Sequence, residues 1–369
     1  MINGTDNSKL IRVLVTDDSA FMRTAITRMI QSDPMLQVVG SAQTGQECLQ
    51  KVVSLKPDVI TLDIEMPGMN GLETLKRLMK DSPLPVIMVS SLTQEGAEVT
   101  LEALHLGAFD YVPKQSSFVS LDIVKIRDDL VAKIKAAAES GRRRAAMKKA
   151  PAPTAPVPAH PAASRGGPQI VPSIIALGTS TGGPKALQEI LPMFPADLPV
   201  PILIVQHMPP GFTGPFARRL NALSKIAVRE AIQEEEIQPG VVYIAPAGQH
   251  MTVYKRGASK TAIRLGRTPE GMLHIPSVDV MMLSVGELFK SLTMGVIMTG
   301  MGADGVKGME LIKREGGFNL GQDEASCTVY GMPRSAAEAG VLHKVVPLNQ
   351  IPDQIMAAVH YKRHAQTTA

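Results

Sequence analysis

Apolar and polar positions follow two different periods along the first half of the chain. Short runs rich in β-branched residues, typical of buried strands, lie at 11–15, 36–39, 58–62, 85–89 and 110–112. Between these runs, apolar residues recur at helical spacing, most clearly at 21–30, 45–55 and 72–80. Strands that alternate with helices predict a parallel sheet with helices on both faces. The first half is therefore predicted to be a doubly wound α/β domain of five βα units.

The second half shows the same alternation with an insert. Buried strands are predicted for the apolar runs at 173–178, 200–205 and 295–299. Further strands, some of them antiparallel, are predicted for the runs at 241–245, 251–254 and 262–265. We therefore expect a second doubly wound α/β domain, with a mostly parallel sheet and a β-hairpin insert.

Residues 150–168 separate the two halves. This segment consists mainly of Pro and Ala and has no pattern from which a packed element can form, so it predicts a semi-extended linker. The chain has 369 residues, enough for two domains with full cores. We place the first domain at 1–135, a basic and Pro/Ala-rich linker at 136–170, and the second domain at 171–369.

The positive charge of the chain is concentrated in one short segment. Five of the 38 Lys and Arg residues lie at 142–149; without them, 33 basic residues face 34 acidic ones, a net charge of −1. The two folded halves are therefore close to neutral, and we predict no nucleic-acid binding. A non-enzymatic nucleic-acid-binding output is the rival hypothesis, and this basic segment is its only support.

Composition also bears on the compartment. The two cysteines, Cys48 and Cys327, lie far apart and have neither metal-ligand nor disulfide spacing. Residues 1–9 lack the apolar core of a signal peptide, and no apolar stretch reaches the roughly 18 residues of a membrane span. We expect a cytoplasmic protein without membrane insertion, and a monomer.

Charged and hydroxyl side chains end the strands of the first domain. Asp17 and Asp18 end the first strand, Asp63 the third and Ser90 the fourth, and Lys114 follows the fifth. In a doubly wound sheet these side chains converge at one edge. Three neighbouring carboxylates repel one another unless a cation neutralises them, and oxygen ligands of this kind suit Mg²⁺. For one aspartate alone, a cap of the following helix would be the favoured interpretation, but the five residues together favour a cation and phosphoryl site.

The same residues lie in motifs that resemble a response-regulator receiver domain over roughly 10–135. These motifs are Val15-Thr-Asp-Asp-Ser19, Asp63-Ile-Glu-Met-Pro-Gly-Met-Asn-Gly71 and Val89-Ser-Ser91. The resemblance implies a flavodoxin-like (βα)5 fold and a phosphoryl group accepted by Asp63 from a chemotaxis histidine kinase. It also implies Mg²⁺ held by Asp17, Asp18 and Asp63, a switch hydroxyl at Ser90, and a phosphate-sensing cation at Lys114. One departure is Pro113-Lys114-Gln115, where the family often has Lys-Pro.

The three apolar runs of the second domain each lead to a reactive side chain. Ser180 lies in Gly178-Thr-Ser-Thr-Gly182 after the first run, His207 follows the second, and Asp304 follows the third. The carboxyl ends of parallel strands line one crevice, so these residues can meet there. A serine, a histidine and an aspartate are the side chains of a charge-relay hydrolase.

Three other interpretations of the Ser180 turn compete with a hydrolase. A dinucleotide-binding fold places an acidic residue at the end of the next strand, where this chain has His207. A P-loop requires Gly-Lys-Ser/Thr, which does not follow. A structural turn in which Ser180 caps the next helix fits the local sequence.

Several motifs of the second domain, in order, resemble the catalytic domain of chemotaxis protein-glutamate methylesterases. They are 174–183, 206–213, 243–246, 276–279, 299–305 and 319–327. The resemblance implies that Ser180 is the nucleophile, His207 the general base and Asp304 the residue that orients it. It further implies that the backbone N–H of Met301 helps to bind the oxyanion and that Thr181 assists, and we expect the Ser180 turn to supply a further N–H group.

The resemblance also implies the substrate and its regulation. The substrate would be methylated glutamyl side chains on the cytoplasmic helices of chemoreceptors, with receptor glutamines deamidated as well, and the catalytic domain would need no cofactor. We expect the receiver to cover the strand-end crevice until Asp63 is phosphorylated.

Overall fold

The structure is a computed structural model that describes residues 10–91, 93–114, 122–149, 171–257 and 259–361. The chain forms two compact units, Met1–Ala155 and Pro156–Ala369. Among the described residues, no helix combines the length and the apolar character needed to cross a bilayer.

The first unit is built on a five-stranded sheet in which every neighbouring pair is parallel. The strand order is β2-β1-β3-β4-β5. The strands are β1 (Ile11–Thr16), β2 (Leu36–Ala42), β3 (Val59–Asp63), β4 (Val86–Ser90) and β5 (Asp110–Pro113). The predicted doubly wound (βα)5 fold of this domain is therefore confirmed.

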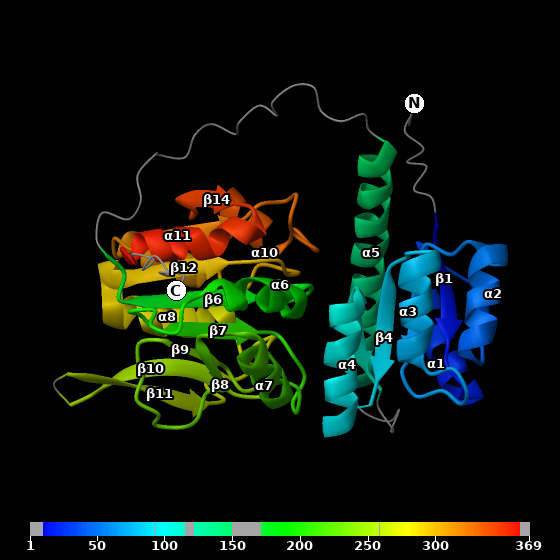
Figure 1. The fold of residues 1–369 in the computed structure, drawn as a ribbon, viewed down its shortest axis with the longest axis horizontal. Coiled ribbons are helices and arrows are strands. Elements are labelled where there is room, and N and C mark those ends of the chain that lie inside the picture. The colour runs from blue at the N-terminus through cyan, green and yellow to red at the C-terminus, as the bar shows by residue number, and fades with distance from the viewer. Residues whose placement is uncertain (1–9, 92, 115–121, 150–170, 258, 362–369) are drawn as a thin grey trace, which may run out of the picture. The chain divides into compact units, whose positions relative to one another are not determined.

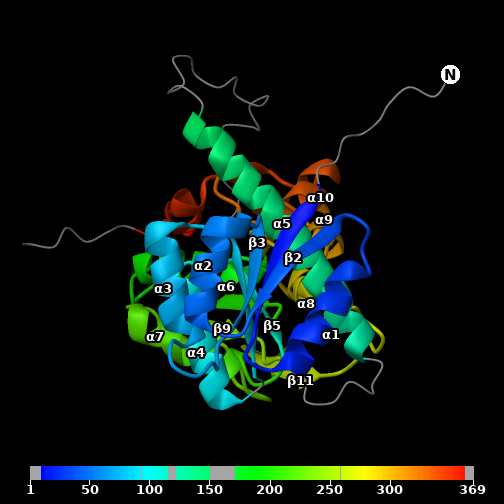
Figure 2. The ribbon, with the colours of Figure 1, turned by 90° about the vertical axis from the view of Figure 1, so that its right-hand side faces the viewer.

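Five helices cover both faces of this sheet. They are α1 (Ala20–Gln31), α2 (Gly45–Leu55), α3 (Gly71–Asp81), α4 (Gln94–Leu106) and α5 (Asp122–Lys149). Helices α1 and α5 pack together on one face, while α2, α3 and α4 follow one another on the other face (Figure 2). Helices α1 to α4 thus each lie in the connection between one strand and the next in the chain, as parallel pairing requires.

The last helix of this unit differs from the sequence prediction. We placed the start of the linker at residue 136, but α5 continues to Lys149. Ala137, Ala138 and Ser140 are buried on its inner face, so these residues contribute to the domain core. The charge of the stretch suggested a solvated linker, whereas Ala, Lys and Arg are strong helix formers and extend a helix that is already packed. Residues 150–170 of the predicted linker lie outside the described residues.

The second unit contains a seven-stranded sheet, again with every pair parallel. Its order is β14-β13-β12-β6-β7-β9-β8 (Figure 1). The strands are β6 (Ile174–Thr179), β7 (Ile202–Gln206), β8 (Ala227–Glu230), β9 (Val241–Ile244), β12 (Thr293–Ile297), β13 (Phe318–Gln322) and β14 (Lys344–Val346). The predicted insert is an antiparallel pair, β10 (His250–Arg256) with β11 (Lys260–Gly266).

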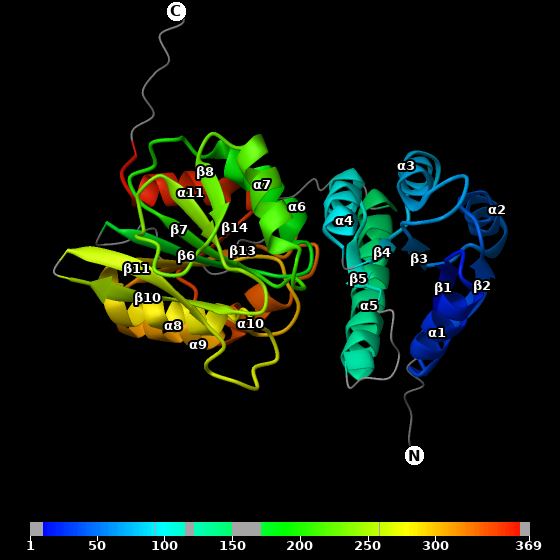
Figure 3. The same ribbon diagram turned by 90° about the horizontal axis from the view of Figure 1, so that it is seen from below.

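Helices again lie on both faces of this sheet. They are α6 (Gly183–Ile190), α7 (Thr213–Leu223), α8 (Val278–Phe289), α9 (Val306–Arg314), α10 (Met332–Glu338) and α11 (Ile351–Ala358). Figure 3 shows α6, α7 and α11 on one face, and α8, α9 and α10 on the other. The mostly parallel α/β fold predicted for this domain is confirmed.

One close contact sets the position of α8. A Cβ atom at Gly178, near the end of β6, would lie 2.3 Å from the Cγ1 atom of Val278. Glycine therefore lets the first turn of α8 rest directly on the strand. This contact brings the helix N-terminus to the carboxyl end of the sheet, where the predicted reactive residues are found.

Candidate active site and phosphoryl-acceptor site

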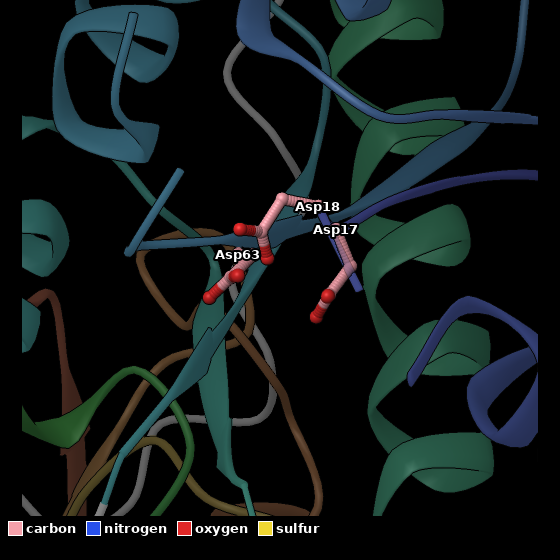
Figure 4. Close-up of side chains that lie close together, drawn as sticks. All are labelled: Asp17, Asp18 and Asp63. Atoms are coloured by element: carbon pink, nitrogen blue, oxygen red, sulfur yellow. The ribbon is translucent and has the colours of Figure 1, made fainter. Parts of the chain in front are cut away.

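Three carboxyl groups meet at the carboxyl end of the first sheet (Figure 4). One oxygen each from Asp17, Asp18 and Asp63 lies within 4.8 Å of the others. Asp17 and Asp63 are buried, whereas Asp18 is exposed. Converging carboxylate oxygens with one side open to solvent match the preference of Mg²⁺ for oxygen ligands and retained waters. The residues present therefore fit a magnesium ion.

The alternative in which these aspartates are the helix caps does not hold. The N-cap of α1 is Ser19, whose hydroxyl accepts the Met22 N–H at 3.4 Å. The N-cap of α3 is Asn70, whose side chain accepts the Glu73 N–H at 2.9 Å. Because other residues cap the helices, the aspartates are left to face one another.

Lys114 joins this cluster. Its Nζ atom lies 2.5 Å from Asp63 Oδ2 and 3.1 Å from Asp17 Oδ2. Burial raises the pKa of Asp63 to about 6, against an opposing effect of the hydrogen bond from Lys114. The pKa of Lys114 is raised in turn, since its two carboxylate partners outweigh burial. The lysine therefore stays a cation beside a carboxyl group whose pKa burial has raised.

Ser90 lies at the expected strand end, but its hydroxyl makes its hydrogen bonds to other residues than Asp63. Its hydroxyl donates to Gly96 O at 3.2 Å and accepts a bond from Thr100 Oγ1 at 2.6 Å. These partners belong to α4, so the hydroxyl is engaged with that helix. Thr100 is a partner that the sequence pattern did not reveal, because its position on a helix face carries no chemical signal.

Sheet register brings Ser180 and His207 together in the second domain. Thr179 of β6 pairs with Gln206 of β7, so the next residue on each strand occupies the adjacent position. The His207 N–H donates to Thr179 O at 3.2 Å. The Gln206 side-chain amide donates to both Ser180 O and His207 O, each at 3.0 Å. Gln206, which the sequence analysis did not single out, thus ties the two backbones together.

Asp304 is hydrogen-bonded to His207. Its Oδ2 atom lies 2.8 Å from His207 Nε2. The first turn of α8 donates three further bonds to this carboxylate: from Ser277 Oγ at 2.8 Å, from Val278 N at 2.7 Å and from Asp279 N at 2.9 Å. A helix N-terminus favours an anion through its free N–H groups and its dipole. Burial alone would raise the pKa of Asp304, but His207 and these donors lower it to about 2.

Asp279 returns the contact from α8 to the Asp304 loop. Its Oδ1 atom accepts the N–H groups of Gly305 and Gly308, each at 2.9 Å. Hydrogen bonds therefore join the two segments in both directions: Asp304 accepts N–H groups from the start of α8, and Asp279 of α8 accepts N–H groups from the residues after Asp304. The Pro276-Ser-Val-Asp279 motif marks this turn in the sequence, but the motif alone does not predict that Asp279 binds the residues after Asp304.

The backbone N–H groups that could bind an oxyanion differ in whether they are already engaged. The Ser180 N–H donates to Thr299 O at 3.0 Å, so it is engaged within the fold. Within the described residues, the backbone N–H groups of Thr181 and Met301 have no such acceptor. Gly300 packs so closely on the serine that a Cβ atom there would lie 2.9 Å from Ser180 Cβ. The loop that carries Met301 therefore lies directly against the Ser180 turn.

Comparison with known families agrees with this two-part architecture. Residues 13–123 match the family model of the response regulator receiver domain, and residues 175–355 match that of CheB methylesterase. The chain is thus a response regulator whose output domain is an enzyme.

Individual relatives define the family further. The chain is 49% identical over 349 residues to a protein-glutamate methylesterase/protein-glutamine glutaminase of Halalkalibacterium halodurans, covering 94% of this chain and 97% of the relative. It is 45% identical over 361 residues to a protein of the same name from Pyrococcus abyssi, covering 96% and 95%. The chain therefore belongs to the family of protein-glutamate methylesterases/protein-glutamine glutaminases, as the sequence motifs predicted.

Among solved structures, the CheB methylesterase catalytic domain of Thermotoga maritima is 40% identical, with a TM-score of 0.49; the match covers 51% of this chain and 99% of that one. The response regulator domain of Thermotoga maritima CheB is 51% identical, with a TM-score of 0.33, and covers 36% and 98%.

Proposed function

We propose that this protein removes methyl ester groups from glutamyl side chains of chemoreceptors, in the cytoplasm, by a serine-hydrolase mechanism. We further propose that the same site converts receptor glutamines to glutamates. The observation that carries the proposal is the His207–Asp304 pair beside Ser180, with Asp304 held by the first turn of α8.

The tautomer of His207 follows from its partner. Asp304 stays ionised because its pKa is about 2, so it accepts a hydrogen bond and His207 Nε2 carries the proton. The other ring nitrogen, Nδ1, is buried without a hydrogen-bond partner among the described residues. That nitrogen has a free lone pair and is the one that we assign to Ser180 as general base.

In the proposed reaction, Ser180 Oγ attacks the ester carbonyl carbon while His207 Nδ1 takes the hydroxyl proton. The tetrahedral oxyanion accepts hydrogen bonds from the N–H groups of Met301 and Thr181, and such donors are each worth roughly 3 kcal/mol in hydrolases. His207 then returns the proton to the leaving methoxide, which departs as methanol. Water attacks the acyl-enzyme by the reverse sequence and leaves a glutamate; with glutamine, ammonia departs instead.

Control of this activity is assigned to the first domain. Asp63 accepts a phosphoryl group from a chemotaxis histidine kinase, and Asp17, Asp18 and Asp63 would hold Mg²⁺. When bound, the ion supplies positive charge that neutralises the transferring phosphoryl oxygens. Lys114 pairs with a phosphoryl oxygen, and Ser90 leaves its α4 partners to donate to another. Phosphorylation then shifts the chain toward a state with higher esterase activity.

The nucleophile assignment is tested by methanol release from a glutamate-methylated receptor fragment. Ser180→Ala and His207→Ala should each abolish turnover. Ser224→Ala is the matched control, because the buried Ser224 hydroxyl has no hydrogen-bond partner among the described residues and lies in neither site. Near-normal turnover in Ser180→Ala would contradict the proposal.

Regulation is tested with a small acyl phosphate and Mg²⁺. The intact chain should gain esterase activity, and Asp63→Asn should show the unstimulated rate with and without the phosphodonor. Equal activity of the wild-type chain under both conditions would argue against phosphoryl control while leaving the esterase assignment standing.

A further inference from the structure

A second imidazole lies against the ring of His207. The rings of His207 and His274 are stacked, with centroids 4.1 Å apart and an angle of 17° between the planes. His274 belongs to the segment between β11 and α8, whereas Ser180, His207 and Asp304 lie in other loops of the domain. The mechanism proposed above gives this ring no task.

The known restraints on His207 leave one degree of freedom open. The hydrogen bond to Asp304 fixes one corner of the ring, at Nε2. A bond at one corner does not fix the plane of the ring, and Nδ1 has no partner among the described residues. A flat face at stacking distance restricts tilt of the ring, which is the motion that the single hydrogen bond permits.

The ring that stacks on His207 and a donor that holds Asp304 come from one short stretch of chain. His274 precedes by three residues the Ser277 hydroxyl that donates to Asp304 at 2.8 Å. At the base of this stretch, the Ser277 N–H donates to His250 Nδ1 at 3.1 Å, and His250 Nε2 bonds to Pro269 O at 3.2 Å. The segment 269–277 is thus tied down at both ends. This segment carries Ser277, which binds the Asp304 carboxylate that holds His207 Nε2, and it also carries His274, whose ring covers the face of His207.

We propose that His274 is a positioning residue, which holds the plane of His207 so that Nδ1 is aimed at the Ser180 hydroxyl. This inference rests on the proposed role of His207 as general base. The observed contact is between the two ring faces, so the aromatic face is the property to which this role is assigned. An aromatic face also suits the cation that His207 becomes when it takes the serine proton. Small misplacements of a catalytic group cost up to about 100-fold in rate.

Three substitutions separate the aromatic face from the polar atoms. His274→Ala removes the ring, His274→Gln keeps a polar side chain without a ring, and His274→Phe keeps the flat face without nitrogen. In the full-length chain, assayed by methanol release from a methylated receptor fragment, we expect kcat to fall about 10- to 100-fold in the Ala and Gln variants. KM should stay within about twofold, and His274→Phe should retain kcat within about threefold of wild type.

His343 offers a matched control for loss of a stacked histidine. Its ring stacks on Phe318 with centroids 5.1 Å apart and the same 17° angle, beside β13 and away from the proposed catalytic residues. His343→Ala should keep kcat at a temperature where the fold is intact. A second readout is the ¹⁵N spectrum of the histidine rings. His207 should show one tautomer, protonated at Nε2, in the wild type and in His274→Phe, and averaged nitrogen shifts in His274→Ala.

The outcomes distinguish this inference from the proposed function. If Ser180→Ala and His207→Ala keep turnover, the hydrolase assignment itself fails. If those variants are inactive but His274→Ala has the wild-type kcat, only the positioning role is overturned. A His274→Phe variant as slow as His274→Ala also overturns it, because the flat face would then not be the property that counts.

Discussion

Replacing Gly300 by alanine is the sharpest test of how the site is packed. The new Cβ atom would lie 2.2 Å from Met332 Sδ, 2.9 Å from Ser180 Cβ and 3.0 Å from Ser180 N. Carbon contacts are favourable at about 3.5 Å or more, so the thioether must retreat by about 1.3 Å and the serine by about 0.6 Å. The thioether ends a flexible side chain, but Met332 is fully buried, so it can move only by displacing its neighbours. The serine is held by its backbone, because Ser180 N donates to Thr299 O at 3.0 Å.

The expected result of Gly300→Ala is a loss of both stability and rate. Overpacking of this kind costs about 1–3 kcal/mol of unfolding free energy. Displacement of Ser180, the proposed nucleophile, by about half an ångström should lower kcat by about 10- to 100-fold. The measurements are urea unfolding and methanol release from a methylated receptor fragment, at a temperature well below the melting point of the variant.

Gly266 supplies the matched control, because a Cβ atom there would meet no atom of the described part of the chain within 4 Å. Gly266→Ala should change stability by no more than about 0.5 kcal/mol and leave kcat unchanged. Wild-type stability and kcat in Gly300→Ala would refute the close packing of the Met301 loop on the Ser180 turn.

Three further substitutions test other contacts. Asp304→Asn places an amide NH₂ among hydrogen-bond donors, so kcat should fall by about 10³- to 10⁴-fold in the methanol assay. The folded-state pKa of Asp304, about 2, lies below its ordinary value of 3.8. The ionised carboxylate therefore adds about 2 kcal/mol to the free energy of unfolding above pH 4, and this contribution is lost as the pH falls toward 2. The difference in unfolding free energy between wild type and Asp304→Asn, measured in urea, should narrow below pH 4, and a constant difference would contradict the lowered pKa. Asp18→Asn should weaken Mg²⁺ binding by at least about tenfold in calorimetry. Because Asp18 is exposed, the domain should stay folded, and an unchanged affinity for Mg²⁺ would exclude Asp18 as a ligand. Gln206→Leu removes two bonds to strand-end carbonyls and should cost about 1–3 kcal/mol in urea unfolding together with a lower kcat, whereas an unchanged kcat would show that the tie between the strands is not needed.

Strand-end chemistry was the part of the site that could be predicted from the sequence. Apolar runs mark parallel strands, and parallel strands present their carboxyl ends at one edge. The positions of Asp17, Asp63, Ser180 and His207 follow from that rule alone. Their chemical types then restrict what the two edges can do.

The remainder depends on contacts that no periodicity encodes. The first turn of α8 lies about 25 residues from Asp304 in the chain, and close packing on Gly178 helps to bring the two together. The stack of His274 on His207 arises from a segment without regular structure, where hydrophobic patterns carry no information. The direction of the Ser90 hydroxyl depends on Thr100, a residue of a neighbouring helix.

Two aspartates that lie largely out of water show how partners decide the pKa of a carboxyl group. Asp63 and Asp304 are both withdrawn from water, which by itself raises the pKa of each. Asp63 shares Lys114 with Asp17 at the same edge, so repulsion between carboxylates adds to burial and its pKa reaches about 6. Asp304 receives four hydrogen bonds, three of them from the first turn of α8, and its pKa falls to about 2. A carboxylate that is poorly stabilised as an anion suits an acceptor of phosphoryl groups, whereas one that is firmly stabilised suits a permanent anion beside a histidine. The difference lies in the number of donors that each fold edge provides, and not in the depth of burial.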